Sequence, residues 1–124
     1  MQSFIRRKSY GCVKVFWLDR DAAKSRFIEA ARRFGYKNSS VTRVVLFGSL
    51  ADGRAVPSSD ADILVVVEAT DLHPLKRPEE FLHYFSDIGM GIDLFVYTEE
   101  EVSCGNISLI NTALKTGIEI YRRK

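Results

Sequence analysis

Two continuous apolar runs constrain the fold of this chain more than any other feature. They occupy positions 44–47 (VVLF) and 63–67 (ILVVV). Runs without polar interruption are typical of strands that are buried on both faces, whereas a half-buried strand alternates. Helical periodicity lies between and around these runs, and strands that alternate with helices indicate a layered α/β (α+β) domain.

The periodicity and the turn residues predict the remaining elements. An alternating β-branched and aromatic segment predicts a strand at 13–17. Asp19 is a suitable N-cap for a helix that runs to about Phe34, with Gly35 as its glycine cap. Further strands are expected at 41–47, 60–67, 91–97 and 118–121, and helices at 49–52, at 79–87, from 99 and after an Asn106 cap up to Gly117.

Length and composition limit the class of protein. The chain has 124 residues, of which 46% are hydrophobic and 27% charged, which is typical of one globular domain spanning 1–124. No apolar run approaches the roughly 20 residues of a membrane span, and the basic start lacks the apolar region of a signal peptide. Cys12 and Cys104 form no CxxC motif, so we expect a reduced, cytoplasmic protein in which both are buried.

Charge is distributed unevenly along the chain. Residues 1–43 contain 11 Lys and Arg against 3 acidic residues, while residues 44–121 contain 4 against 13. Such asymmetry suggests that the acidic part gathers cations and the basic part meets anions. The alternative is that the basic residues only solvate a helix face.

Three aspartates interrupt the apolar strands. Asp60 and Asp62 are two residues apart, so in a strand their side chains point the same way, about 6.6–7 Å apart. Their carboxylates would repel unless a cation lay between them, and oxygen ligands suit Mg²⁺ or Mn²⁺. If the strand that contains Asp93 lies beside them, three carboxylates converge, which is the minimum for the two metal ions of nucleotidyl transfer.

Gly48 and Ser49 follow the first buried strand directly. A glycine at this place lets the backbone approach a ligand closely, and a helical turn that opens at Ser49 attracts phosphate. Taken singly, a Gly-Ser turn or an Asp-x-Asp pair is usually structural. In this order and spacing they favour a metal–phosphate site.

The combination resembles a known family. Gly48-Ser49, ten residues, Asp60-Ala61-Asp62 and a later Asp93 are similar to the signature of the DNA polymerase beta-like nucleotidyltransferases, and more narrowly of the minimal nucleotidyltransferases. The resemblance covers about residues 19–121 and implies a mixed β-sheet flanked by helices. It also implies that Asp60, Asp62 and Asp93 are catalytic and bind two Mg²⁺ ions, or Mn²⁺, and that Gly48 and Ser49 bind the triphosphate.

The resemblance further implies a function. The expected activity is transfer of a nucleoside monophosphate, AMP from ATP, onto a hydroxyl of a partner. A partner chain, for which a HEPN-type helical toxin with this chain as its antitoxin is favoured, or a self-associated dimer would complete the acceptor pocket. One alternative is a non-catalytic nucleotide- or partner-binding module of the same fold. Another is a nucleic-acid-binding protein, for which the sequence shows no clear aromatic stacking platform.

Overall fold

The central feature of the fold is a four-stranded mixed sheet. The computed structural model describes residues 4–123. The sheet has the order β5-β4-β3-β6, with β4 antiparallel to β3, β6 antiparallel to β3, and β5 parallel to β4. The strands of the chain are β1 (Ile5–Tyr10), β2 (Val13–Leu18), β3 (Val41–Phe47), β4 (Ala61–Val67), β5 (Ile92–Thr98) and β6 (Ile118–Arg122).

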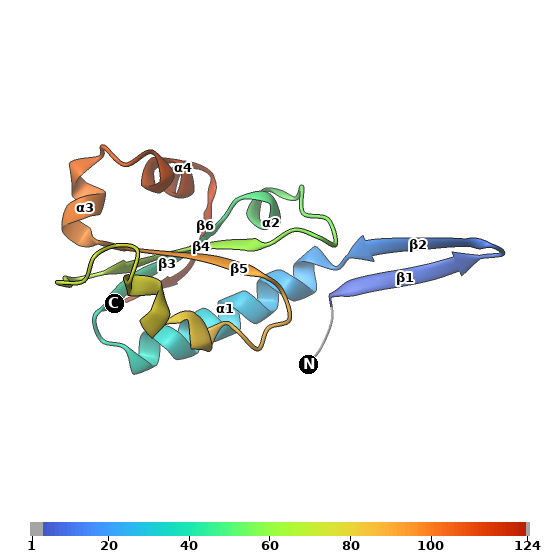
Figure 1. The fold of residues 1–124 in the computed structure, drawn as a ribbon, viewed down its shortest axis with the longest axis horizontal. Helices are drawn as coiled ribbons and strands as arrows, with labels where there is room; N and C mark the ends of the chain where they lie inside the picture. The colour runs from blue at the N-terminus through green and yellow to red at the C-terminus, as the bar shows by residue number, and fades with distance from the viewer. Residues whose placement is uncertain (1–3, 124) are drawn as a thin grey trace.

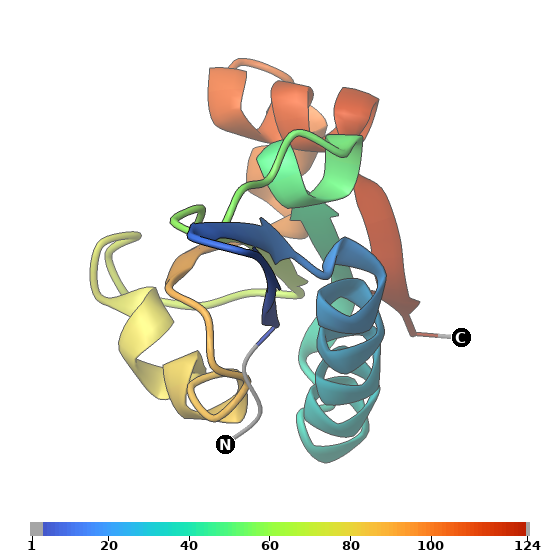
Figure 2. The same cartoon turned by 90° about the vertical axis from the view of Figure 1, so that its right-hand side faces the viewer.

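Helices cover both faces of this sheet (Figure 1). The α-helices are α1 (Arg20–Lys37), α2 (Ser49–Asp52), α3 (Glu99–Cys104) and α4 (Ser108–Thr116), and the 3₁₀ helices are η1 (Arg77–Glu80) and η2 (Leu82–Tyr84). Helix α1 and the two 3₁₀ helices lie on one face, while α3 and α4 lie on the other (Figure 2). The predicted mixed sheet flanked by helices is therefore confirmed.

The two central strands are buried as their composition predicts. Val44 and Leu46 of β3 pack on the α1 side, and the alternate residues Val45 and Phe47 pack on the α4 side. Strand β4 divides its side chains between the same two cores. A strand with two buried faces has no polar face to present to water, which explains the continuous apolar runs.

The edge strand β5 is not buried on both faces, unlike β3 and β4. Its buried residues, Leu94, Val96 and Thr98, alternate with more exposed ones, and Asp93 is exposed. The sequence predicted a buried strand here. The alternation arises because β5 pairs only with β4, and α3 and α4 cover its outer face incompletely.

Helix α1 begins as predicted and ends later. The Asp19 side chain accepts a hydrogen bond from the Ala22 amide at 3.1 Å, which confirms the N-cap. The helix continues through Gly35 to Lys37, with Asn38 as its C-cap, so the prediction of a glycine cap was wrong. A Cβ at Gly35 would lie 2.1 Å from the ring of Tyr121, so the glycine serves close packing of α1 on β6.

Three further expectations need correction. The segment predicted as a helix at 79–87 forms parts of two short 3₁₀ helices instead. Phe81, between them, and Phe85, directly after the second, are buried, but Leu82 is 42% exposed. The last helix is capped at Ile107, without a side-chain hydrogen bond, rather than at Asn106. Both Cys12 and Cys104 are exposed and unpaired, because each lies near a turn rather than in a core.

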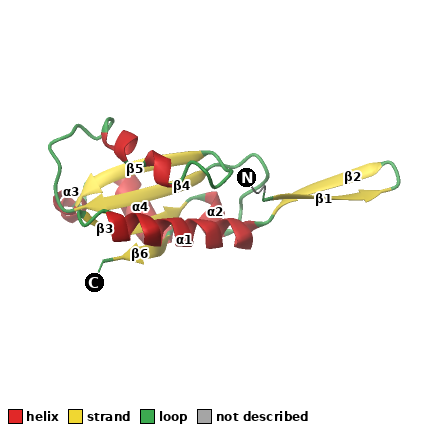
Figure 3. Ribbon diagram, turned by 90° about the horizontal axis from the view of Figure 1, so that it is seen from below, coloured by secondary structure: helices red, strands yellow, loops and turns green. Residues whose placement is uncertain are grey.

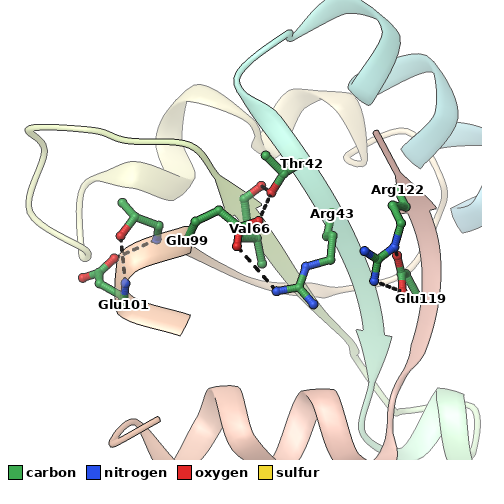
Figure 4. Close-up of polar contacts among 8 residues, drawn as sticks. Thr42, Arg43, Val66, Glu99, Glu101, Glu119 and Arg122 are labelled. Atoms are coloured by element: carbon green, nitrogen blue, oxygen red, sulfur yellow. Dashed lines mark hydrogen bonds and ion pairs between the residues drawn. The ribbon is translucent and has the colours of Figure 1, made fainter. Parts of the chain in front are cut away.

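The two ends of the sheet differ in character. At one end, polar contacts join β3, β4 and α3. The single hydroxyl hydrogen of Thr42 can be donated either to Glu99 at 2.5 Å or to the Val66 carbonyl at 3.1 Å, and Arg43 pairs with Glu99 at 3.8 Å (Figure 4). At the opposite end, where β3 finishes and β4 and β5 start, the predicted site residues gather.

Strands β1 and β2 form a separate hairpin that projects from the body (Figures 1 and 3). The strand predicted at 13–17 is confirmed as β2, whereas β1 was not predicted. Within residues 4–123, no helix has both the length and the apolar character needed to cross a membrane.

Candidate active site

Gly48 sets the geometry where β3 meets α2. Its backbone adopts φ 74° and ψ −157°, a conformation that is essentially restricted to glycine. A Cβ at this position would lie 2.1 Å from Oδ2 of Asp62. The backbone of Gly48 therefore lies directly against the Asp62 carboxyl group, and the half-buried Ser49 opens α2 beside it.

Asp62 and Asp93 occupy neighbouring positions on β4 and β5. The two residues are register partners in the parallel pair, and adjacent strands lie about 4.7–4.9 Å apart. Their side chains lie on the face that also carries Phe47, the register partner of Asp62 on β3, and Phe95, two residues after Asp93; the ring centroids of these two phenylalanines are 6.0 Å apart. The expectation that the Asp93 strand lies beside the strand of Asp62 is confirmed.

The surroundings of Asp62 disfavour its ionised form. Burial raises the pKa of the Asp62 carboxyl group, and the nearby charges of Asp93 and Asp60 raise it further. A hydrogen bond with the Asp93 carboxyl group acts in the same direction. Burial is the largest of these causes, and the repulsion between carboxylates that the sequence predicts adds to it.

Asp60 lies differently from the prediction. Strand β4 begins at Ala61, so Asp60 precedes the strand rather than sharing it with Asp62. A Cβ at Gly91 would lie 2.1 Å from Oδ1 of Asp60, which places that carboxyl group against the start of β5. The Ala61 amide also donates to the Gly91 carbonyl at 2.8 Å.

Gly91 is a site residue that sequence reasoning missed. Its only signal was a glycine directly before the strand of Asp93, which by itself is typical of a turn. Arg54, in the loop between Ser49 and Asp60, pairs with Asp52 at 2.7 Å and has a 74% exposed side chain, so it is a solvated loop residue.

The arrangement of the carboxyl groups decides whether they could hold a metal ion as they stand. Among residues 4–123, no group of three or more His, Cys, Asp or Glu side chains is arranged so that it could hold a metal ion. The chemistry of the donors nevertheless fits a divalent cation, because Asp93 and Asp60 both act on Asp62 through their charge and all three offer hard oxygen ligands.

Residues 29–124 match the family described as Polymerase beta, Nucleotidyltransferase. The chain belongs to this family, and the resemblance seen in the sequence is confirmed. No curated protein matches the chain significantly.

Solved structures share the fold. A candidate nucleotidyltransferase from Sulfolobus solfataricus superposes with a TM-score of 0.62 at 19% identity, over 84% of this chain and 84% of that one. A toxin-antitoxin structure with AMP-PNP superposes with a TM-score of 0.57 at 20% identity, over 78% of this chain and 74% of that one. At these identities the likeness concerns the fold.

Proposed function

We propose that this nucleotidyltransferase moves AMP from ATP onto a hydroxyl group of a partner and releases pyrophosphate. The observation that carries the proposal is the position of Asp62, between the backbone of Gly48 and the register partner Asp93. A triphosphate held at Gly48 and Ser49 would lie beside these carboxyl groups. The nucleotide and the acceptor would therefore meet at the same end of the sheet.

The aspartates would hold the divalent cations of the reaction. Asp60, Asp62 and Asp93 are the proposed ligands for two Mg²⁺ ions, or Mn²⁺, and the carboxyl groups would draw closer together on binding them. The cations, when bound, neutralise the triphosphate and lower the pKa of the acceptor hydroxyl. This role agrees with the raised pKa of Asp62: burial is the largest cause of the shift, and a cation would relieve the repulsion from Asp93 and Asp60 that adds to it.

The remaining residues would orient the triphosphate and assist the acceptor hydroxyl. Gly48 and Ser49 would orient the triphosphate through backbone and hydroxyl hydrogen bonds. Asp93, exposed at the start of β5, would favour loss of the acceptor's proton. The acceptor oxygen then bonds to the α-phosphorus as the bond from that phosphorus to the pyrophosphate oxygen breaks. Such transfer depends on positioning and electrostatics more than on covalent chemistry.

The proposed acceptor is a protein. The fold is shared with a toxin-antitoxin structure that contains AMP-PNP, which supports a HEPN-type helical toxin as the partner, adenylylated on a tyrosine with this chain as antitoxin. A second copy of the chain is the other candidate partner, which would complete the acceptor pocket by forming a dimer. The alternative of a non-catalytic binding module is less well supported, because all three carboxyl groups are present.

Single substitutions test this assignment. Asp93→Asn keeps the size of the side chain but removes the charge that assists the attacking hydroxyl, so the loss should appear in the rate rather than in binding. We expect single-turnover transfer of label from [α-³²P]ATP to fall at least about 10²-fold, or roughly 2.7 kcal/mol. Calorimetric affinity for Mg²⁺-ATP should change less than about tenfold, or 1.4 kcal/mol.

Two comparisons make the test specific. Asp62→Asn should weaken ATP binding and transfer together, because it removes a ligand from the nucleotide's own metal ion. Asp71→Asn, an exposed aspartate at the opposite end of the sheet, should change neither. Near-normal transfer by Asp93→Asn would remove Asp93 from the mechanism, and Mg²⁺-dependent ATP binding without any label transfer would favour the binding module.

A further inference from the structure

The β1–β2 hairpin is anchored at its base and exposed along its length. Phe4 and Leu18 are buried in the main core, and the Asp19 amide donates to the Phe4 carbonyl at 2.7 Å. Every residue of β1 is exposed. Because a two-stranded ribbon on its own is marginally stable, a ribbon that extends away from the body (Figure 3) is suited to gain buried surface from a partner.

Exposed aromatic side chains lie on both faces of the hairpin. Tyr10 is 57% exposed, Phe16 55% and Trp17 45%. The register pairs Arg6 with Trp17 and Tyr10 with Val13, which places Tyr10 and Trp17 on one face, and it pairs Arg7 with Phe16 on the other. Each face therefore presents a large ring to solvent, and exposed apolar side chains that gather on one element mark an interaction site, whereas singly scattered ones do not.

Cations are interleaved with these rings. Lys8 lies on the Tyr10 face, with its Nζ 5.3 Å from the centroid of the Tyr10 ring, and Arg7 and Lys14 lie on the Phe16 face. Residues 4–18 contain four Lys and Arg and no acidic residue. A partner must therefore tolerate or neutralise positive charge along the whole ribbon.

This combination distinguishes between two kinds of partner. Protein–protein interfaces are depleted in lysine, whereas Lys8 and Lys14 lie on the ribbon close to its exposed rings. Nucleic acid instead offers phosphates to cations and flat bases to aromatic rings. Bases are available for stacking on a side chain only where they are unpaired, so the chemistry favours a single strand over a duplex.

We propose that the β1–β2 hairpin binds single-stranded nucleic acid, with Tyr10, Phe16 and Trp17 stacking on bases and Arg7, Lys8 and Lys14 contacting phosphates. The hairpin supplies the stacking platform that the sequence did not reveal. The proposal uses none of the residues assigned to nucleotidyl transfer, so it stands or fails independently of the proposed function.

The unmodified chain provides the first test. Trp17 is the only tryptophan, so its fluorescence reports directly on the hairpin. Addition of a single-stranded 12-mer, in RNA and DNA versions, should quench this fluorescence in a saturable manner, and the dissociation constant should agree with that from anisotropy of a labelled oligomer. A logarithmic slope of affinity against salt near about −2 is expected for three phosphate contacts on a single strand.

Matched double variants provide the second test. Tyr10→Ala with Lys8→Gln should weaken binding of the single-stranded 12-mer at least about tenfold, since it removes both a ring that stacks on a base and a cation that contacts a phosphate. Tyr36→Ala with Lys37→Gln removes the same groups from the exposed end of α1, and it should change binding less than about twofold. Circular dichroism and melting would show that both variants remain folded.

Several results would overturn the proposal. These are the absence of Trp17 quenching, equal losses in the two double variants, or binding of a 12-base-pair duplex as tight as that of the single strand. If the oligomers do not bind but the hairpin variant changes the sedimentation mass of the chain, the hairpin is instead a contact between two copies.

Discussion

Gly48 and Gly91 each lie where a side chain would meet an aspartate of the site. At Gly48 a Cβ would lie 2.1 Å from Asp62, and at Gly91 the same distance from Asp60. The atoms met are the ends of flexible side chains, so they could move aside at little cost in stability. A substitution would then displace the carboxyl group rather than unfold the chain.

Substitution of Gly48 should separate backbone strain from the position of Asp62. Gly48→Ala forces alanine into φ 74°, which should lower the free energy of unfolding by about 1–3 kcal/mol. It should also displace the Asp62 carboxyl group and reduce nucleotidyl transfer at least about tenfold. Denaturant unfolding and single-turnover transfer measure the two effects.

The matched control is Gly53→Ala. Gly53 also has a positive φ, 84°, but an added Cβ there would meet no atom within 4 Å. The Gly53→Ala variant should therefore lose about 1–2 kcal/mol of stability but keep its rate of nucleotidyl transfer. Equal activity of the two variants would contradict the inference that Gly48 makes room for Asp62.

Hydrogen bonds in its first turn hold helix α3 in place. The Thr98 side chain accepts a hydrogen bond from the Glu101 amide, and the Glu101 carboxylate accepts one from the Thr98 amide at 2.8 Å, which forms a capping box (Figure 4). Glu101 also accepts a hydrogen bond from the buried Arg77 at 2.6 Å. The start of α3 is thereby joined to η1.

Removal of the Glu101 charge should destabilise the fold. Glu101→Gln leaves the guanidinium of Arg77 buried without its counter-ion, which should lower the free energy of unfolding by about 2–4 kcal/mol. Glu29→Gln breaks an exposed ion pair with Arg33 on α1, and it should change the free energy of unfolding by less than about 0.5 kcal/mol. Similar losses in both variants would mean that Arg77 finds another partner.

The same carboxyl group should make stability depend on pH. Burial raises the pKa of Glu101, but the hydrogen bonds from Arg77 and Thr98 outweigh burial and hold the pKa below its usual value. A lowered folded pKa stabilises the native state above the unfolded pKa, near 4.3, and this stabilisation is lost as pH falls through the folded value. Urea titrations from pH 6 to pH 3 should therefore show a shallower decline for Glu101→Gln than for the unmodified chain.

At the scale of the whole molecule, charge is separated in space. The basic first third of the sequence forms the hairpin and α1, whereas the acidic remainder forms most of the sheet and the site. Within the site, the raised pKa of Asp62 means that its ionised form opposes folding at neutral pH. A cation and a triphosphate bound there should relieve this cost and stabilise the native state globally.

Thermal unfolding should report this coupling. Mg²⁺ together with ATP should raise the Tm more than either ligand alone, because each favours binding of the other at the same carboxyl groups. At about 100 times the dissociation constant the stabilisation is about 2.7 kcal/mol, or roughly 6–15 °C for a domain of this size. Asp62→Asn should lose most of this shift, and stabilisation by ATP that is undiminished in excess EDTA would contradict a metal site.

The strands and helices were largely predictable, because their signals are local. Continuous apolar runs identified β3 and β4, and Asp19 and the acidic residues after Thr98 marked the starts of α1 and α3. Strand β1 was missed because Ile5–Tyr10 contains three consecutive cations and no buried face. Gly35 was misread because a glycine near a helix end suits a cap as well as it suits contact with a distant tyrosine.

The sequence by itself determined the family, the element order and the set of acidic residues that define the candidate site, since each follows from residue types at fixed spacing along the chain. Only the tertiary structure decided that β5 lies parallel to β4 with Asp93 level with Asp62, that Asp60 rests against Gly91, and that the hairpin exposes its aromatic rings. The physical reason is that strand pairing, close packing and exposure depend on which distant segments meet, and local periodicity carries no information about distant partners.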